Sequence, residues 1–259
     1  MIDMEYVITS GALTARVDTR GAQLRALKYK DTDYLWPGGD AWGWSAPVCC
    51  PWCGAVEGGA FGHAGRTYAA SRHGFVRESE HELAERSGDT LTFALRVGEG
   101  DARWPWPFEL TARYALDGCT FALTYEITNT GAETMPLQFG FHPGFIAPAG
   151  SVIRAEKADM PDGSDALAIV PGLFDGGSID LAAPESAWFR LERPDGHCVT
   201  VATEGYPYVL LWGASGETPF ACIEPWSGYP GSGGMFDRPG VTALAPGETF
   251  ARTLKIALG

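Results

Sequence analysis

A histidine at the end of an alternating apolar run is the first candidate for acid/base chemistry. His142 follows residues 135–141, in which apolar side chains alternate with Gln138 and Gly140, so an extended chain directs the imidazole away from the apolar row. The proline after the histidine favours that extended backbone, and the flanking glycines leave room for a ligand. The pattern predicts that His142 exchanges protons with a ligand that Gln138 also contacts. A histidine that merely ends a strand would show the same pattern.

A carboxylate inside an apolar run is the second candidate. In residues 220–226, the side chains of Phe220, Cys222, Glu224 and Trp226 share one side of an extended chain. Burial would raise the pKa of Glu224 and make it a better proton acceptor near neutral pH, and Trp226 could stack on the apolar C–H face of a sugar. The alternative is a core carboxylate held in a salt bridge.

The segment Ser71-Arg-His-Gly-Phe-Val-Arg77 contains a second histidine with a ligand-binding setting. Gly74 after His73 permits close approach of a ligand to the backbone, and Arg77 can donate hydrogen bonds to hydroxyl or phosphate oxygens. The sequence therefore predicts that His73 and Arg77 bind substrate. Ordinary surface-loop polarity is the competing interpretation.

Cys50-Pro-Trp-Cys53 is a Cys-X-X-Cys pair, which in a strand-helix-strand setting would indicate redox chemistry. The surrounding pattern is not of that kind, so we interpret the pair as a buried or incidental cluster. A second Cys/His pair with zinc-finger spacing, a phosphate-binding P-loop and a Gly-x-Ser-x-Gly elbow are all missing from the sequence. We expect neither a metal nor a nucleotide cofactor.

The elements that must position these residues are predicted to be strands. Residues 91–97 alternate apolar and polar side chains, and residues 108–116 and 119–127 repeat the pattern around Asp117-Gly118, a hairpin signal. Further strand-like runs cover 13–17, 24–29, 198–203, 208–212, 220–224 and 249–258. With 34 Gly and 18 Pro among them and hardly a helical pattern, the chain is predicted to be a large antiparallel all-β sandwich.

Length and charge restrict the organisation and the partners. The 259 residues suit one β-sandwich domain spanning 1–259, with residues 227–240 as a Gly-rich loop. The formal net charge of −13 disfavours nucleic acid and membrane surfaces as partners. The first residues show neither a signal peptide nor a spanning helix, so we expect a cytoplasmic protein whose six cysteines remain thiols.

Three motifs in this order resemble the aldose 1-epimerase (galactose mutarotase) family, especially its bacterial mutarotase-like branch of unassigned substrate. His73-Gly-Phe-Val-Arg77 is similar to that branch's His-Gly-Phe-Ala-Arg, and Gly140-Phe-His-Pro-Gly-Phe145 is similar to Gly-x-His-Pro-x-Phe. Cys222-Ile-Glu-Pro-Trp226 matches its Cys-Ile-Glu-Pro-Trp. The resemblance spans most of the chain.

The resemblance implies a supersandwich of antiparallel strands and a cofactor-free interconversion of the α and β anomers of an aldose. Matched residue by residue, His142 falls on the family's general acid, Glu224 on its general base and His73 on a histidine near the ring oxygen. For that cycle His142 must start protonated and Glu224 ionised, a combination that two adjacent opposite charges would stabilise.

Other features of the sequence do not decide whether the substrate is an aldose or an aldose phosphate. Residues 53–57 lack the Gly-Arg and Asn-Arg pairs of many mutarotases, so Arg72 or Arg77 could replace them, and both Asp175 and Asp180 are candidates for the family's binding aspartate. The Pro51-Trp52 pair resembles the hexose-6-phosphate 1-epimerase relatives, which use basic residues to hold a phosphate. A noncatalytic carbohydrate-binding or sensing sandwich is the further alternative.

Overall fold

The protein is built almost entirely of β-strands. A computed structural model describes residues 4–217 and 219–259. The helical segments in these ranges are two single 3₁₀ turns, η1 (Glu57–Gly59) and η2 (Val76–Glu78). Within the described ranges, no helix combines the length and hydropathy needed to span a membrane.

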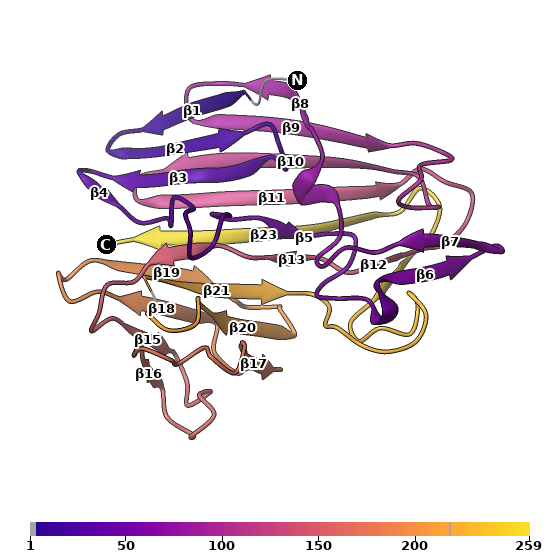
Figure 1. Ribbon diagram of the computed structural model, residues 1–259. Coiled ribbons are helices and arrows are strands. Elements are labelled where there is room, and N and C mark those ends of the chain that lie inside the picture. Colours follow the sequence, from indigo (N-terminus) through magenta and orange to yellow (C-terminus); the bar gives the residue numbers. More distant parts are fainter. Residues whose placement is uncertain (1–3, 218) are drawn as a thin grey trace.

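A nine-stranded sheet forms one layer of the molecule (Figure 1). Every strand in it pairs antiparallel with its neighbours. The order across the sheet is β16 (Ala166–Ala168), β15 (Val152–Ala155), β18 (Trp188–Glu192), β19 (Cys198–Ala202), β23 (Thr249–Leu258), β11 (Thr120–Asn129), β10 (Phe108–Asp117), β9 (Thr90–Val97) and β8 (Glu82–Arg86).

Two smaller sheets form the second layer. The four-stranded sheet runs β1 (Glu5–Ser10), β2 (Leu13–Asp18), β3 (Gln23–Tyr29) and β4 (Thr32–Asp33). The six-stranded sheet runs β17 (Ile179–Ala182), β20 (Tyr208–Trp212), β21 (Phe220–Trp226), β13 (Gly140–Phe141) and β5 (Val48–Cys49), with β14 (Gly144–Ile146) also paired to β21. The remaining pairs are β12 (Met135–Leu137) with β22 (Thr242–Leu244) and β6 (Ala60–His63) with β7 (Arg66–Ala69).

The two layers pack through alternating apolar side chains. The ring of Phe93 on β9 lies 5.7 Å from that of Tyr6 on β1, and the ring of Tyr125 on β11 lies 6.0 Å from that of Phe141. The nine-stranded sheet thus backs both smaller sheets, which follow one another along it with their strands running in similar directions (Figure 1). The predicted antiparallel all-β sandwich is confirmed.

The hairpin predicted at Asp117-Gly118 is present, with its turn one residue further along. Asp117 pairs with Thr120, so the two central residues are Gly118 and Cys119. Of these two only Gly118 has a positive φ, 59°, as a type II′ turn requires.

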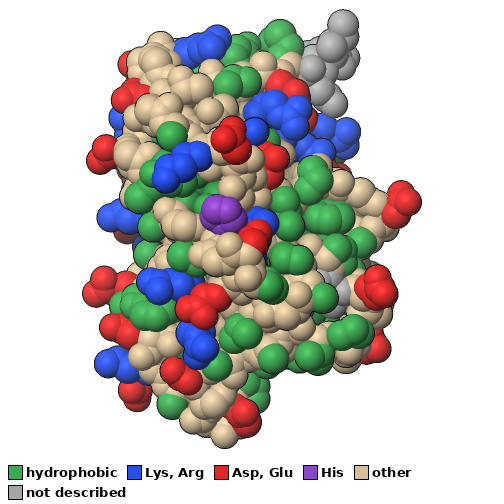
Figure 2. Space-filling view, turned by 90° about the vertical axis from the view of Figure 1, so that its left-hand side faces the viewer, with side chains coloured by type: hydrophobic (Ala, Val, Ile, Leu, Met, Phe, Trp, Pro, Cys, Tyr) green, Lys and Arg blue, Asp and Glu red, His purple; other side chains and the backbone are tan. Residues whose placement is uncertain are grey.

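On the face that Figure 2 shows, Lys and Arg side chains lie interspersed with Asp and Glu, and no band of one sign covers the described residues there.

Candidate active site

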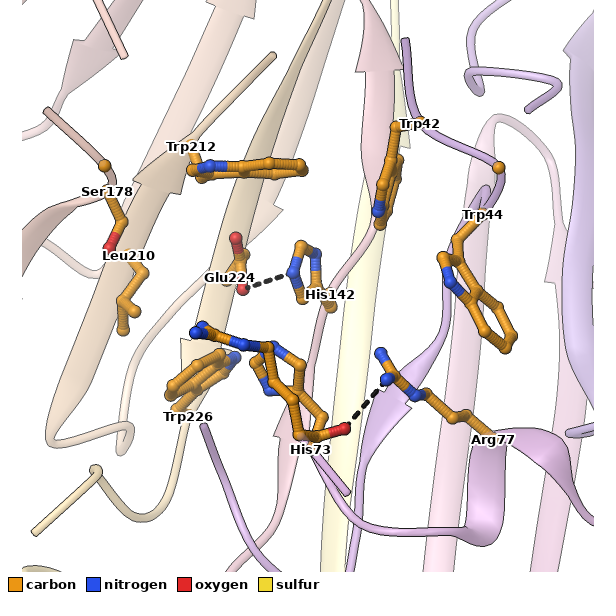
Figure 3. Close-up of a pocket in the computed structure, with 13 residues that line it drawn as sticks. Trp42, Trp44, His73, Arg77, His142, Ser178, Leu210, Trp212, Glu224 and Trp226 are labelled. Carbon is orange, nitrogen blue, oxygen red and sulfur yellow. Dashed lines mark hydrogen bonds and ion pairs between the residues drawn. The ribbon is translucent and has the colours of Figure 1, made fainter. Parts of the chain in front are cut away.

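Strand register brings His142 and Glu224 face to face. Gly140 pairs with Trp226 and Gly144 pairs with Cys222, so the antiparallel arrangement places position 142 opposite position 224. The Nε2 atom of His142 lies 3.3 Å from Oε2 of Glu224 (Figure 3). Both residues are buried, at 7% and 2% exposure. Two residues 82 positions apart in the chain therefore form one pair.

The pair lies in the wall of a cavity of about 560 Å³. Its lining is strongly aromatic: the ring of Trp42 stacks on His142 at 5.0 Å, and the ring of Trp212 meets the same imidazole edge-on at 5.6 Å. A cavity of this size, which combines apolar rings with several convergent polar side chains, is typical of a small-molecule site. The full lining is Trp42, Gly43, Trp44, Arg72, His73, Arg77, His142, Gly177, Ser178, Leu210, Trp212, Glu224 and Trp226.

Trp226 lies on this wall, as predicted for a substrate contact. Its indole Nε1 donates to the Phe141 carbonyl at 3.2 Å, which fixes the ring. A Cβ atom at Gly140 on the neighbouring strand would overlap this indole, so the glycine permits the close approach of the two strands.

His73 contributes an oriented hydrogen-bond donor to the cavity. Its Nδ1 accepts the backbone N–H of Gly54 at 3.1 Å and lies 3.0 Å from Sγ of Cys49, so the proton of the neutral ring belongs on Nε2. Burial, followed by the neighbouring His142, lowers the pKa of His73 to about 2. The ring lies edge-on to His142 at 5.4 Å. His73 is therefore a neutral N–H donor beside the pair.

Arg77 lines the same cavity from η2. Its guanidinium donates to the Arg72 carbonyl at 2.7 Å and lies over the Trp44 ring, 4.9 Å from the ring centroid. The cation-π contact and the hydrogen bond hold the side chain in place beside the cavity (Figure 3). Arg72 also lines the cavity, so both arginines proposed as hydroxyl or phosphate donors are present on its wall.

Gln138 does not line this cavity, which corrects the prediction that it contacts a substrate. Its Oε1 accepts the N–H of Cys53 at 3.2 Å and Nε of Arg238 at 3.0 Å. Its amide nitrogen donates to the carbonyls of Tyr229 and Pro239 at 2.9 and 2.7 Å. These four bonds use the amide fully, so Gln138 fastens the loop after β21 instead of holding a ligand.

Arg238, buried at 2% exposure, completes this fastening within the Gly-rich stretch 227–240. It donates to the carbonyls of Cys53 at 2.6 Å and Ala55 at 3.2 Å as well as to Gln138. The sequence interpretation of 227–240 as a plain loop missed it, because one arginine in a Gly-rich run carries no signal of burial.

Replacing Arg238 by methionine should lower the free energy of unfolding by about 3 kcal/mol, because the buried carbonyls it serves lose their donor. Urea unfolding followed by circular dichroism measures the change. The control Arg113→Met, at an exposed position of β10, should stay within about 0.5 kcal/mol of the parent. Equal unfolding midpoints for the two variants would contradict the role given to Arg238.

Asp180 is the binding-aspartate candidate that the structure places near the pair. It pairs with Leu210 on β20, and Leu210 pairs with Glu224, so the three positions form one row across the sheet. The hydroxyl of Tyr229 donates to the Asp180 carboxylate. Asp175 instead accepts the backbone N–H of Gly216 at 2.8 Å and serves the loop.

Burial shifts the pKa values of both members of the pair toward their neutral forms. Burial raises the pKa of Glu224 well above its usual value, and burial followed by the charge of Arg77 lowers the pKa of His142 to about 3. These directions favour the neutral form of each group, whereas a charged couple was the expectation from the sequence.

The cysteines near the site are buried thiols. Cys50 is fully buried and Cys53 likewise, and burial raises the pKa of the Cys50 thiol well above its usual value. A thiol of this kind is a poor nucleophile, in agreement with a structural Cys-X-X-Cys cluster.

His142, Cys222 and Glu224 form a group of potential metal ligands, since their ligand atoms all lie within 4.8 Å of one another. Residues 4–217 and 219–259 contain no other such group.

Solved structures first identify the fold. A galactose mutarotase-like protein from Lactobacillus casei has a TM-score of 0.91 and 25% identity, with 99% of this chain and 100% of that chain covered. A galactose mutarotase related enzyme from Lactobacillus acidophilus has a TM-score of 0.92 and 23% identity, with 99% and 97% covered. The fold is therefore that of galactose mutarotase-like proteins.

The family follows from the sequence match. The model described as aldose 1-epimerase matches residues 4–164, and the chain belongs to the aldose 1-epimerase family. The chromosomal LacX protein of Lactococcus lactis subsp. lactis is 27% identical over 288 aligned positions, covering 95% of this chain and 96% of that protein. The uncharacterized protein YphB of Escherichia coli K12 is 26% identical over 59% of this chain and 56% of its own length.

Proposed function

We propose that the protein is an isomerase that interconverts the α and β anomers of an aldose by opening and closing its ring. The observation that carries the proposal is the buried His142–Glu224 pair, 3.3 Å apart in the wall of a cavity lined by tryptophans. Family membership and the fold agree with it. The sugar ring would lie against the indoles through its C–H faces, and the pair would face its hemiacetal.

The chemistry needs one proton donor and one proton acceptor. Glu224 takes the proton of the anomeric O1–H, the electrons of that bond form the C1=O1 double bond, and the C1–O5 bond breaks while O5 takes a proton from His142. Rotation about C1–C2 presents the other face of the aldehyde. Ring closure then reverses both transfers and yields the other anomer.

Burial of the pair assists the opening step. With the closed sugar bound, the competent pair is ionised Glu224 beside protonated His142. After opening, the proton is on Glu224 and the imidazole is neutral, which is the form that burial favours for both groups. The low-dielectric cavity therefore stabilises the state with the aldehyde relative to the charged starting pair.

The pair is active while it holds one proton, so the rate should not fall as the pH is lowered through the ordinary histidine pKa of about 6.5. Loss on the acid side requires a second proton, on His142, whose pKa burial lowers to about 3. Loss on the alkaline side follows removal of the single proton from Glu224, whose pKa burial raises. NMR exchange rates, corrected for the buffer rate at each pH, measure the profile. An acid limb near the ordinary histidine pKa of about 6.5 would contradict this assignment.

The experiment for the function itself is exchange spectroscopy of the anomeric protons of glucose, galactose and their 6-phosphates. Acceleration of any of them over buffer supports the proposal. Rates equal to buffer across the panel, with sugar binding detected by calorimetry, would instead identify a noncatalytic carbohydrate-binding sandwich.

A sugar phosphate is the second candidate substrate, because Arg72 and Arg77 both line the cavity. Guanidinium groups suit phosphate oxygens. The 6-phosphate members of the panel separate this candidate from a neutral aldose.

A further inference from the structure

A second cavity of about 270 Å³ adjoins the candidate active site. Its lining is Asp18, Arg20, Gln23, Arg25, Gly43 and Trp44. Gly43 and Trp44 also line the larger cavity that contains His142 and Glu224. The two hollows therefore both border the segment 43–44, and a ligand longer than one sugar ring could extend past this segment from one hollow to the other.

The segment between the two cavities is firmly held. Oε1 of Gln23 accepts the backbone N–H groups of Ser45 at 2.9 Å and Ala46 at 3.4 Å. Nη1 of Arg25 donates to the same oxygen at 3.2 Å. Gln23 is buried at 5% exposure, so the position of Trp44 relative to β3 is set by buried hydrogen bonds.

The chemistry of the second cavity suits a neutral polyhydroxylated ring. Arg20 and Arg25 supply donors, the carboxylate of Asp18 supplies an acceptor, and Trp44 supplies an indole surface. A carboxylate in the same lining as the two guanidiniums reduces the attraction of the cavity for a phosphate, and the net charge of −13 adds to that effect. Hydroxyl groups can use both kinds of partner.

The direction from the pair to the second cavity fixes which end of the sugar carries the extension; this step rests on the proposed function. With O1 at Glu224 and O5 at His142, the C5–C6 end of a pyranose lies beyond His142 on the side away from Glu224. Trp42, Arg77 and Trp44 lie on that side in Figure 3, and Ser178 and Leu210 lie on the other. A group attached to O6 is therefore directed toward Trp44.

We propose that the second cavity binds a glycosyl unit attached to O6 of the reacting aldose, so that the preferred substrate is the reducing end of a 1→6-linked disaccharide. The reducing sugar occupies the cavity of the His142–Glu224 pair and keeps its free anomeric hydroxyl. The second ring lies between Trp44 and the two arginines.

Exchange of the reducing-end anomeric protons tests this with four sugars: glucose, isomaltose (1→6), maltose (1→4) and glucose 6-phosphate. Isomaltose should show a kcat/KM about 10-fold above those of glucose and maltose. Maltose is the matched control because it has the same composition but extends from O4, on the carbon opposite C1, whereas isomaltose extends through C6 from the carbon bonded to O5. Glucose 6-phosphate tests whether a charge, and not a second ring, is recognised.

Arg20→Ala tests the cavity itself, since this side chain is exposed and lines the second cavity without lining the first. The ratio of kcat/KM for isomaltose to that for glucose should fall about 10-fold. Because both sugars are assayed on one preparation, the ratio does not depend on the fraction of folded protein. Arg113→Ala, an exposed arginine on β10, should leave the ratio at the parent value.

The outcomes separate this inference from the function. Accelerated exchange of glucose, with isomaltose no better than glucose or maltose, overturns the disaccharide site and leaves the epimerase standing. Preference for glucose 6-phosphate over isomaltose, or an unchanged ratio in Arg20→Ala, also overturns it. Absence of acceleration for every sugar rejects the proposed function itself.

Discussion

Glu224→Gln should lower the rate of anomer exchange by about 10²- to 10⁴-fold, the contribution of a positioned general acid or base. The amide has the size of the carboxylate but cannot accept the anomeric proton. Because Glu224 is 2% exposed and faces His142 at 3.3 Å, no solvent-exposed group can take its place at the same distance. Exchange NMR on the best substrate of the panel measures the loss.

A stability measurement and a matched control variant distinguish a loss of catalysis from a loss of folded protein in this experiment. Oε2 of Glu224 is buried and, among the described residues, has no hydrogen-bond partner, so the neutral amide should keep the free energy of unfolding at or above that of the parent. Glu126→Gln, at an exposed position of β11, should retain the parent rate. A Glu224→Gln protein with a rate within about twofold of the parent would rule out Glu224 as the base.

Gly74→Ala should remove more than about 4 kcal/mol of stability, enough to prevent accumulation of folded protein. Gly74 has a φ of +74°, and a Cβ atom there would overlap the carbonyl oxygen of Cys50. The obstacle is backbone, which cannot rotate away as a side chain can. Soluble yield and the thermal unfolding midpoint measure the effect.

Gly100→Ala is the matched control, since Gly100 has a φ of +77° and open space around its Cβ position. This variant should lose only about 1–2 kcal/mol of the free energy of unfolding, the penalty for placing a side chain in the left-handed backbone region. If the two alanine variants unfold at the same midpoint, the close approach of residue 74 to Cys50 does not limit stability.

The sequence predicted those features that depend on local alternation. The strand runs at 91–97 and 108–127 have side chains of period two, and the structure buries one face of each. The hairpin was predicted one residue early, because an Asp-Gly pair marks the presence of a turn more reliably than its centre.

The site was predictable in its residue types but not in its contacts. The approach of His142 to Glu224 depends on the register of β13 and β14 against β21, which no local pattern specifies. Gln138 lies on the same side of its strand-like run as His142. Its amide oxygen, however, accepts a hydrogen bond from Arg238, which lies a hundred residues away in the sequence. Trp42, which stacks on His142, was missed although the string Trp42-Gly-Trp44 offered a signal of an aromatic binding surface.

The protonation of the pair also required the structure. Adjacent opposite charges suggested an ion pair, but the burial of both residues shifts the pKa of each toward its neutral form. The sequence contains the two groups, while their desolvation comes from Trp42, Trp212 and the strands around them.

The most direct test of the central claim is a double-variant comparison of exchange rates for Glu224→Gln, His142→Gln and the protein with both changes. If the two groups act as one proton-sharing pair on the same hemiacetal, the double variant should be about as slow as the slower single variant, because either loss already disables the pair. Losses that multiply in the double variant would show that the two residues act independently, and would contradict the account.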